Sequence, residues 1–299
     1  MEPNFWVSLD PRVQGAIAGG IIGALVGTPL KYLLDRSMVG HRLRTEYRYE
    51  QRKELHNLIG RYHGRILTAA DILKSPLYDF YGFSDLFDSA RTAKWLEVDG
   101  QDYQGADYRY TRIVYRFLAV TTLIQRFEAE SHYLDSRIAE KEDFRFLNYI
   151  KLLQKAATDI HLFDGVVQRY DVEAVIREDT IRSDVLRTIS DSYWRGERFL
   201  DLNQFKTRMG RDKNLAPVLQ FFANLRRKEC RLRWDRLIVF HFVLVRLINA
   251  FGYDYQGTKK EDLEELLKEI ENPEICDTLK AWFREYRLPF QEIECKKNA

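Results

Sequence analysis

Residues 13–30 read VQGAIAGGIIGALVGTPL, a run of 18 residues without a charged side chain. Continued through Lys31 to Leu34, this run forms a helix of roughly 33 Å at 1.5 Å per residue, which is long enough to cross the hydrocarbon core of a bilayer. The residues before the run carry acids rather than a net positive charge, and no A-x-A site follows it, which disfavours a cleaved signal peptide. We therefore predict one retained transmembrane helix over residues 13–34.

Small residues recur at every fourth position inside this run. One row consists of Gly15, Gly19, Gly23 and Gly27, and the adjacent row consists of Ala16, Gly20, Ala24 and Thr28. Rows of small residues let helix backbones approach closely, so the pattern predicts self-association with another copy of the same helix. The run resembles the glycine-zipper helices of homo-oligomeric channels, in which such helices line a pore, and this resemblance implies a homo-oligomer of three or more subunits. A tight dimeric anchor that conducts nothing is the alternative. Pro29 lacks an N–H and can bend the last turn of the span.

The charges that flank the run indicate its orientation. Only Arg12, beside two acids, precedes it, whereas seven cations follow it: Lys31, Arg36, Arg42, Arg44, Arg48, Arg52 and Lys53. This bias predicts that residues 1–12 lie outside and the rest of the chain in the cytoplasm, as in a single-pass protein of the bacterial inner membrane. The first four of these cations, Lys31, Arg36, Arg42 and Arg44, are expected to contact the lipid surface.

The remainder of the chain has helical spacing of apolar residues. A basic juxtamembrane helix is predicted over 35–74, ending at Ser75-Pro76, and a helical domain over 75–299. Further helices are expected at 108–130, 144–157, 172–189, 216–231, 234–251 and 260–287. Because no segment has strict period two, the predicted fold class is all-α. The apolar run 237–251 is short and carries His241 and Arg246, which indicates a buried core helix.

Composition narrows the range of functions. The chain has 47 Lys and Arg against 45 Asp and Glu, so any electrostatic function must be local. Its cysteines, Cys230, Cys276 and Cys295, are too widely spaced for a metal site or a disulfide framework, and they indicate a reduced compartment. The usual signatures of phosphate-binding loops, serine hydrolases, zinc proteases and kinases are absent from the sequence. We therefore expect neither catalytic residues nor a metal or cofactor.

Three arginine–histidine pairs are an exception to this lack of motifs. They are Arg36/His41, Arg126/His132 and Arg236/His241. Their spacing resembles the motif of helical ribonucleases of the HEPN type, so a ribonuclease is kept as an alternative. His241 lies in an apolar helical segment, where a hydrogen-bonded core histidine is the simpler interpretation.

The strongest local charge lies in residues 187–236, which contain 13 Lys and Arg against six Asp and Glu. Its densest part contains Arg226, Arg227, Lys228, Arg231, Arg233 and Trp234. On a helix, Arg227 and Arg231 share a stripe, so these cations can converge on a phosphate while Trp234 stacks on a base. The cluster predicts a site for a nucleotide or an oligonucleotide. The alternative is a surface on which acids neutralise the cations.

A self-associating span, a juxtamembrane helix and a cationic helical domain together look like the single-span effectors of bacterial antiphage defence, including the Hailong-type channel effector. The resemblance lies in the architecture. It implies an oligomeric, ion-conducting pore that is controlled by an oligonucleotide signal and arrests growth by permeabilising the membrane. A non-conducting tether or scaffold for a protein partner is the other interpretation.

Overall fold

The computed structural model describes residues 10–82, 94–100, 102–132, 134 and 139–290, apart from the side chains of residues 11, 13–15 and 17–37. The chain divides into two compact units, Met1–Glu54 and Leu55–Ala299. Helices dominate the described residues, which confirms the all-α prediction. One helix, α1 (Pro11–Phe80), begins in the first unit and ends in the second.

Helix α1 provides all of the described backbone of the first unit except residue 10. The predicted span 13–34 belongs to this helix, but the side chains of Gly15, Gly19, Gly20, Gly23, Gly27, Thr28, Pro29, Lys31 and Arg36 lie outside the described residues. No helix, in the part of the chain that the structure describes, combines the length and the apolar character that a membrane span requires. The span and its glycine rows therefore remain predictions.

The side chains of residues 38–54, which follow the predicted span, are almost all exposed. Arg42 and Arg44 are among them, and Arg42 Nε donates to Glu46 Oε1 one helical turn later, at 2.8 Å. Three large apolar side chains, Val39, Leu43 and Tyr47, are also exposed at four-residue spacing. Residues four apart are neighbours on a helix surface, so these three form an uncovered apolar row on α1.

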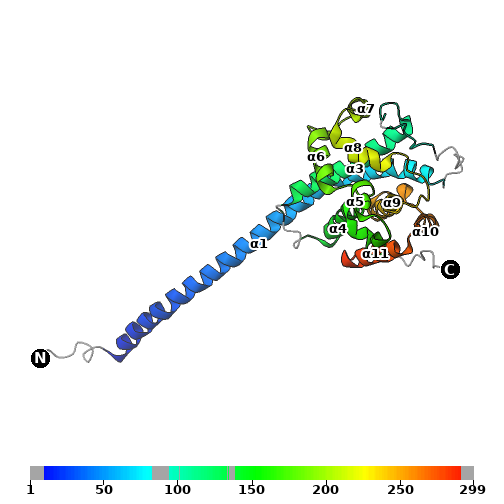
Figure 1. Cartoon of the computed structure of the whole chain (residues 1–299). Helices are drawn as coiled ribbons and strands as arrows, with labels where there is room; N and C mark the ends of the chain where they lie inside the picture. Colours follow the sequence, from blue (N-terminus) through cyan, green and yellow to red (C-terminus); the bar gives the residue numbers. More distant parts are fainter. Residues whose placement is uncertain (1–9, 83–93, 101, 133, 135–138, 291–299) are drawn as a thin grey trace. The chain divides into compact units, whose positions relative to one another are not determined.

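The larger unit consists mainly of helices (Figure 1). After α1 the elements are α3 (Tyr108–Ser131), α4 (Lys141–Thr158), η3 (Ile160–Phe163), η4 (Val167–Arg169), α5 (Val172–Glu178), α6 (Ser183–Tyr193), β1 (Trp194–Arg195), β2 (Arg198–Phe199), α7 (Leu202–Met209), η5 (Lys213–Leu215), α8 (Ala216–Phe222), α9 (Leu232–Phe251), η6 (Asp254–Gln256), α10 (Lys260–Lys268) and α11 (Pro273–Glu285). The two strands form an antiparallel hairpin, and Gly196 at its turn has a φ of 59°, which glycine adopts without strain.

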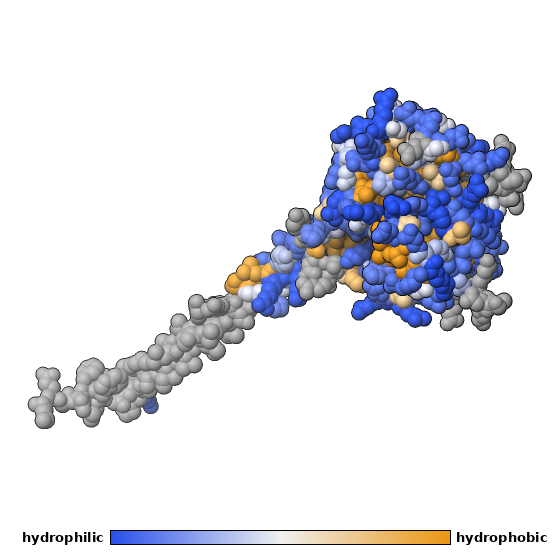
Figure 2. All heavy atoms as spheres, viewed as in Figure 1, coloured by the Kyte–Doolittle hydropathy of each residue, from blue (hydrophilic) through white to orange (hydrophobic). Residues whose placement is uncertain are grey.

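The core of this unit is organised around α9, which packs against α4 and α10, while α3 packs against α6, α7 and α8. Every residue of α9 from Leu232 to Ile248 is buried, as expected for a core helix. The face of the unit seen in Figure 2 is mostly hydrophilic and carries separate hydrophobic patches. The second half of α1, from Leu55 onwards, contributes Leu58, Ile66 and Leu73 to the same core.

Pro76 does not end α1, which continues to Phe80, so the predicted helix end at Ser75-Pro76 is wrong. Proline has no N–H to donate to the carbonyl four residues earlier, which belongs to Ile72. The guanidinium of Arg116 in α3 donates to that carbonyl instead, at 2.9 Å. A side chain from a neighbouring helix thus replaces the missing bond, and Leu77 and Phe80 remain helical and buried.

Other predicted helices are shorter than expected. The segment 172–189 is interrupted between α5 and α6, and 260–287 is interrupted before Pro273, which begins α11. The segment 216–231 is helical only to the end of α8. There Asn224 takes a left-handed φ of 55°, and its amide exchanges hydrogen bonds with the backbone of Val98 at 3.1 and 3.2 Å. This long-range pairing stabilises a chain reversal in place of further helix.

Candidate functional site

The predicted cationic cluster lies in the loop between α8 and α9 rather than on a continuous helix. Lys228 has a left-handed φ of 56° in the middle of this loop. Arg227 and Arg231 consequently do not share a helical stripe, which corrects the geometry predicted from the sequence. Their guanidinium groups instead point to separate acidic partners.

Acids neutralise most of this cluster. Arg227 binds both carboxylate oxygens of Glu269, at 3.0 and 2.8 Å, and Lys228 Nζ lies 3.5 Å from the same carboxylate. Arg231 lies 2.6 Å from Asp179 and 3.1 Å from Glu178. The cluster therefore has the alternative arrangement, in which internal ion pairs occupy the cations.

Two further members of the cluster are buried. Arg233 pairs with Glu229 and donates to the carbonyls of Gln220, Phe221 and Ala223. Trp234 is fully buried, and its Nε1 donates to Glu269 O at 2.8 Å. The prediction that Trp234 offers a face to a base is therefore wrong, because the ring has no accessible surface. Arg226, which is exposed, is the cluster member whose side chain has no ion pair among the described residues.

The Arg236/His241 pair is also inside the core. Arg236 donates to the carbonyls of Asp179, Ala156 and Asp159, and burial lowers its pKa to about 9. Burial also lowers the pKa of His241 to about 3, and neither ring nitrogen has a hydrogen-bond partner among the described residues. His241 is therefore buried as predicted, but it is not satisfied. Neither side chain can reach a substrate.

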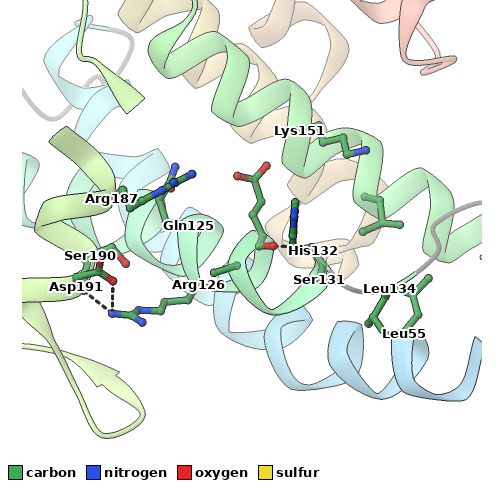
Figure 3. A pocket seen from close by; sticks show the side chains of 13 residues that line it. Leu55, Gln125, Arg126, Ser131, His132, Leu134, Lys151, Arg187, Ser190 and Asp191 are labelled. Atoms are coloured by element: carbon green, nitrogen blue, oxygen red, sulfur yellow. Dashed lines mark hydrogen bonds and ion pairs between the residues drawn. The ribbon is translucent and has the colours of Figure 1, made fainter. Parts of the chain in front are cut away.

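The Arg126/His132 pair has a different environment, because both residues line one cavity of about 650 Å³ in the larger unit. Helices α3, α4 and α6 supply most of its walls. In Figure 3, Arg126 and Arg187 lie on one side of the cavity, and His132 and Lys151 lie on the other. The charged or titratable lining residues are Arg126, Glu128, His132, Lys151, Arg187 and Asp191.

The cations of this cavity differ in their partners. Arg126 donates to Asp191 Oδ1 at 3.0 Å and to the carbonyl of Ser190 at 3.1 Å, and these contacts fix its position. Lys151 and Arg187 are exposed, and no carboxylate of the described residues lies within ion-pair distance of either. The cavity therefore presents two cations that an anionic ligand can bind without breaking an internal ion pair.

Glu128 is the acid that can oppose such a ligand. Burial raises the pKa of Glu128 to about 7, against a hydrogen bond from Gln154 and the positive charges of Lys151 and Arg187. Near neutral pH this carboxyl is therefore divided between its protonated and ionised forms. The protonated form removes a negative charge from the cavity and adds a hydrogen-bond donor, which favours an anion.

Sequence reasoning found two of these residues through their spacing and missed the others. Lys151 and Arg187 lie on helices other than that of Arg126, and nothing in their local sequence distinguishes them from solvated surface cations. Glu128 lies in α3 between Arg126 and His132, and a carboxylate two residues from an arginine is unremarkable until burial changes its pKa. The arrangement can bind phosphate, and in Glu128 and His132 it holds groups that can transfer protons.

Comparison with family models, with characterised proteins and with solved structures finds no match to this chain. The class of protein is accordingly defined by the fold and the cavity. It is an all-α protein whose larger unit carries a polar, partly cationic cavity between α3, α4 and α6.

Proposed function

We propose that this chain is a homo-oligomeric effector of the bacterial inner membrane whose helical unit binds a phosphate-bearing ligand, and that this ligand controls an ion-conducting pore formed by the span 13–34. The observation that carries the proposal is the cavity in which Lys151 and Arg187 have no carboxylate partner among the described residues. The antiphage role comes from the architectural resemblance.

The ligand site in this proposal is the cavity rather than the loop between α8 and α9. A ligand at the loop would compete with Glu269 and Asp179 for Arg227 and Arg231. In the cavity, Lys151 and Arg187 are available, and Arg126 is already positioned by Asp191. A cavity of about 650 Å³ also falls within the range of small-molecule sites, which favours a nucleotide or a short oligonucleotide.

Self-association is supported by the glycine rows of the sequence and by the apolar row on α1. Val39, Leu43 and Tyr47 leave large apolar side chains exposed in the charge-rich part of α1 that follows the predicted span. Contact with the same row of another subunit would bury them. The glycine rows and the apolar row lie on one helix. In this proposal the same subunits therefore contact one another through their spans and through the segments that follow the spans.

The test compares the double variant Lys151→Glu, Arg187→Glu with wild type. Binding of a labelled adenosine triphosphate and of a short oligoadenylate is measured on the full chain in detergent, and membrane depolarisation is measured in cells. We expect both signals to be lost, while Arg177→Glu, which changes an exposed arginine of α5, keeps them. Depolarisation that persists in a folded double variant would refute ligand control through this cavity.

A helical ribonuclease is the second candidate, and the shared cavity of Arg126 and His132 favours it. Glu128, with its raised pKa, would supply a second group for proton transfer. The purified chain is incubated with labelled single-stranded RNA. Cleavage that is lost in His132→Ala and retained in His161→Ala, where an exposed histidine is replaced, would establish the nuclease. An intact RNA with wild-type protein would eliminate it.

A further inference from the structure

A second group of cations lies on the N-terminal half of α3. Arg109, Arg112 and Arg116 recur at intervals of three and four residues, which places them on one face of the helix. They line a cavity of about 440 Å³ together with Asp71 and Ile72 of α1. Arg116 and Arg126 are separated by about 15 Å along the helix axis, so this cavity is distinct from the one around Lys151.

The three arginines are held close to one another, and two of them have no ion pair among the described residues. Arg109 lies 3.8 Å from Asp107, whereas Arg112 and Arg116 have no carboxylate partner among the described residues. Burial lowers the pKa of Arg116, and the charge of Arg112 lowers it further. Two carboxylates, Asp71 and Asp79, also line the cavity. Asp71 is already occupied by Lys74, at 3.1 Å, and Asp79 makes an interaction of its own. An anion that contacts several guanidinium groups would relieve this repulsion.

Each of these arginines is also positioned by a neighbour. Arg116 donates to the carbonyl of Ile72, Arg109 Cζ lies 4.9 Å from the ring centroid of Trp95, and Arg112 Cζ lies 5.2 Å from that of Tyr108. Stacking on a ring leaves the N–H edges of a guanidinium free for bidentate contact with phosphate. The arginines are therefore ordered before any ligand binds.

One exposed aromatic ring lies beside the cations, and two more lie on a segment that is hydrogen-bonded to the cavity wall. Tyr108 is 57% exposed, although it begins α3 beside the arginines. Tyr253 and Tyr255 are 72% and 81% exposed and stack with nearly parallel rings, 5.6 Å apart. Gln256, which follows Tyr255 in the sequence, donates from its side-chain amide to Asp71 of the cavity wall at 3.3 Å. Tyrosines with this exposure have no role in the core.

We propose that this face of α3, with Tyr108, Tyr253 and Tyr255 beside it, binds single-stranded nucleic acid. The arginine forks contact successive phosphates along about 10 Å of helix, and the exposed rings stack on bases. A small anion would use the arginines and leave the tyrosines without a role, and the acidic side chains of a peptide carry no aromatic rings to stack on them. The inference does not depend on the function proposed for the other cavity.

The experiment measures fluorescence anisotropy of a labelled oligothymidylate titrated with the full chain in detergent, at two salt concentrations. We expect Arg112→Ala to weaken binding about tenfold. It should also reduce the slope of log affinity against log salt by about 0.7 for each phosphate that is no longer neutralised, as is usual for single strands. Tyr255→Ala should weaken binding about fivefold or more, because a base then has no ring to stack on.

Arg112→Lys keeps the charge but removes the fork, so its affinity should lie between those of wild type and Arg112→Ala. Arg116 is left unchanged because it supports α1 at Pro76.

Two controls make the outcome decisive. The variant Arg177→Glu, which changes an exposed arginine of α5 outside both cavities, should bind the oligothymidylate as wild type does, and thermal unfolding monitored by circular dichroism should show that all variants are folded. Wild-type affinity in both Arg112→Ala and Tyr255→Ala would overturn the proposal. Loss of binding in Lys151→Glu, Arg187→Glu, together with wild-type affinity in Arg112→Ala and Tyr255→Ala, would assign the strand to the other cavity. Competition by polyglutamate as effective as competition by unlabelled oligonucleotide would identify an acidic-peptide surface instead.

Discussion

At the scale of single residues, His241 is the clearest case of a polar group that the core accommodates without a partner. Its ring packs against that of Tyr81, 5.3 Å between centroids, and both nitrogens lack hydrogen-bond partners among the described residues. A buried donor or acceptor without a partner costs about 1–3 kcal/mol. We therefore expect His241→Leu to raise the free energy of unfolding by about 1 kcal/mol, because similar volume is kept while the unsatisfied atoms are removed.

The same residue makes stability depend on pH. The folded-state pKa of His241 is lowered from 6.5 to about 3, so between these values the unfolded chain binds more protons than the folded chain. The stability contributed by the neutral ring is present above pH 6.5 and is lost as pH falls towards 3. Urea unfolding at pH 7 and pH 4.5 should show a smaller loss of stability in His241→Leu than in wild type. An identical loss in both proteins would contradict this assignment.

Glu128 should make ligand binding depend on pH near neutrality. Its pKa is raised from 4.5 to about 7, so the carboxyl gains its proton as pH falls through 7 and stops repelling an anion. Binding of labelled adenosine triphosphate should therefore be stronger at pH 6 than at pH 8. In Glu128→Gln, which imitates the protonated form, we expect the tighter affinity at both values. An unchanged pH dependence in this variant would assign the effect to His132 or to the ligand.

At the scale of helices, Pro76 and Arg116 form a coupled pair. Arg116 supplies the hydrogen bond that proline cannot make to the carbonyl of Ile72. Arg116→Met should destabilise the fold by about 1 kcal/mol, because the carbonyl of Ile72 loses its charged donor. In a Pro76→Ala background the backbone N–H of residue 76 can take over, so the cost should be smaller. A double-mutant cycle from urea unfolding measures this coupling, and additive effects would mean that the two residues act independently.

Substitutions in the loop between α8 and α9 distinguish cations that are free to bind a ligand from cations that stabilise the fold. Arg227→Glu would place a carboxylate against the buried carboxylate of Glu269, and we expect a loss of about 3 kcal/mol, as when one partner of a buried ion pair is removed. The matched change Arg226→Glu, at an exposed position of the same loop, should cost about 0.5 kcal/mol or less. Comparable effects of the two substitutions on urea unfolding would mean that the ion pair with Glu269 contributes little.

The structure of this loop could not be predicted from the sequence, whereas several helices could. The strongly periodic segments that became α3, α4 and α9 were predicted nearly to their ends, because local spacing of apolar residues determines them. The end of α8 depends on Asn224 pairing with Val98, and the neutralisation of Arg227 depends on Glu269, so both are long-range contacts without a local signal. The continuation of α1 through Pro76 has no local signal either, since the compensating donor, Arg116, lies in α3.

The residues of the candidate site were likewise only partly predictable from the sequence. A spacing rule identified Arg126 and His132, which lie on one helix, whereas Lys151 and Arg187 became visible only when the packing of α4 and α6 against α3 brought them to one cavity. The stripe of Arg109, Arg112 and Arg116 had a readable signal, because its three- and four-residue spacing is that of one helix face.

At the scale of the whole molecule, assembly is the property on which the proposed pore depends. If the rows of Gly15, Gly19, Gly23 and Gly27 bring helix backbones together, Gly19→Leu and Gly23→Leu should each reduce the mass of the oligomer in detergent, because a bulky side chain separates the helices. Gly20→Leu tests the adjacent row. Ile21→Leu, which exchanges one large apolar side chain for another in the same span, is the matched control and should keep the wild-type mass and depolarising activity. An oligomer of three or more subunits that persists in both Gly19→Leu and Gly23→Leu would assign assembly to another surface, for which the exposed row of Val39, Leu43 and Tyr47 on α1 is the next to substitute.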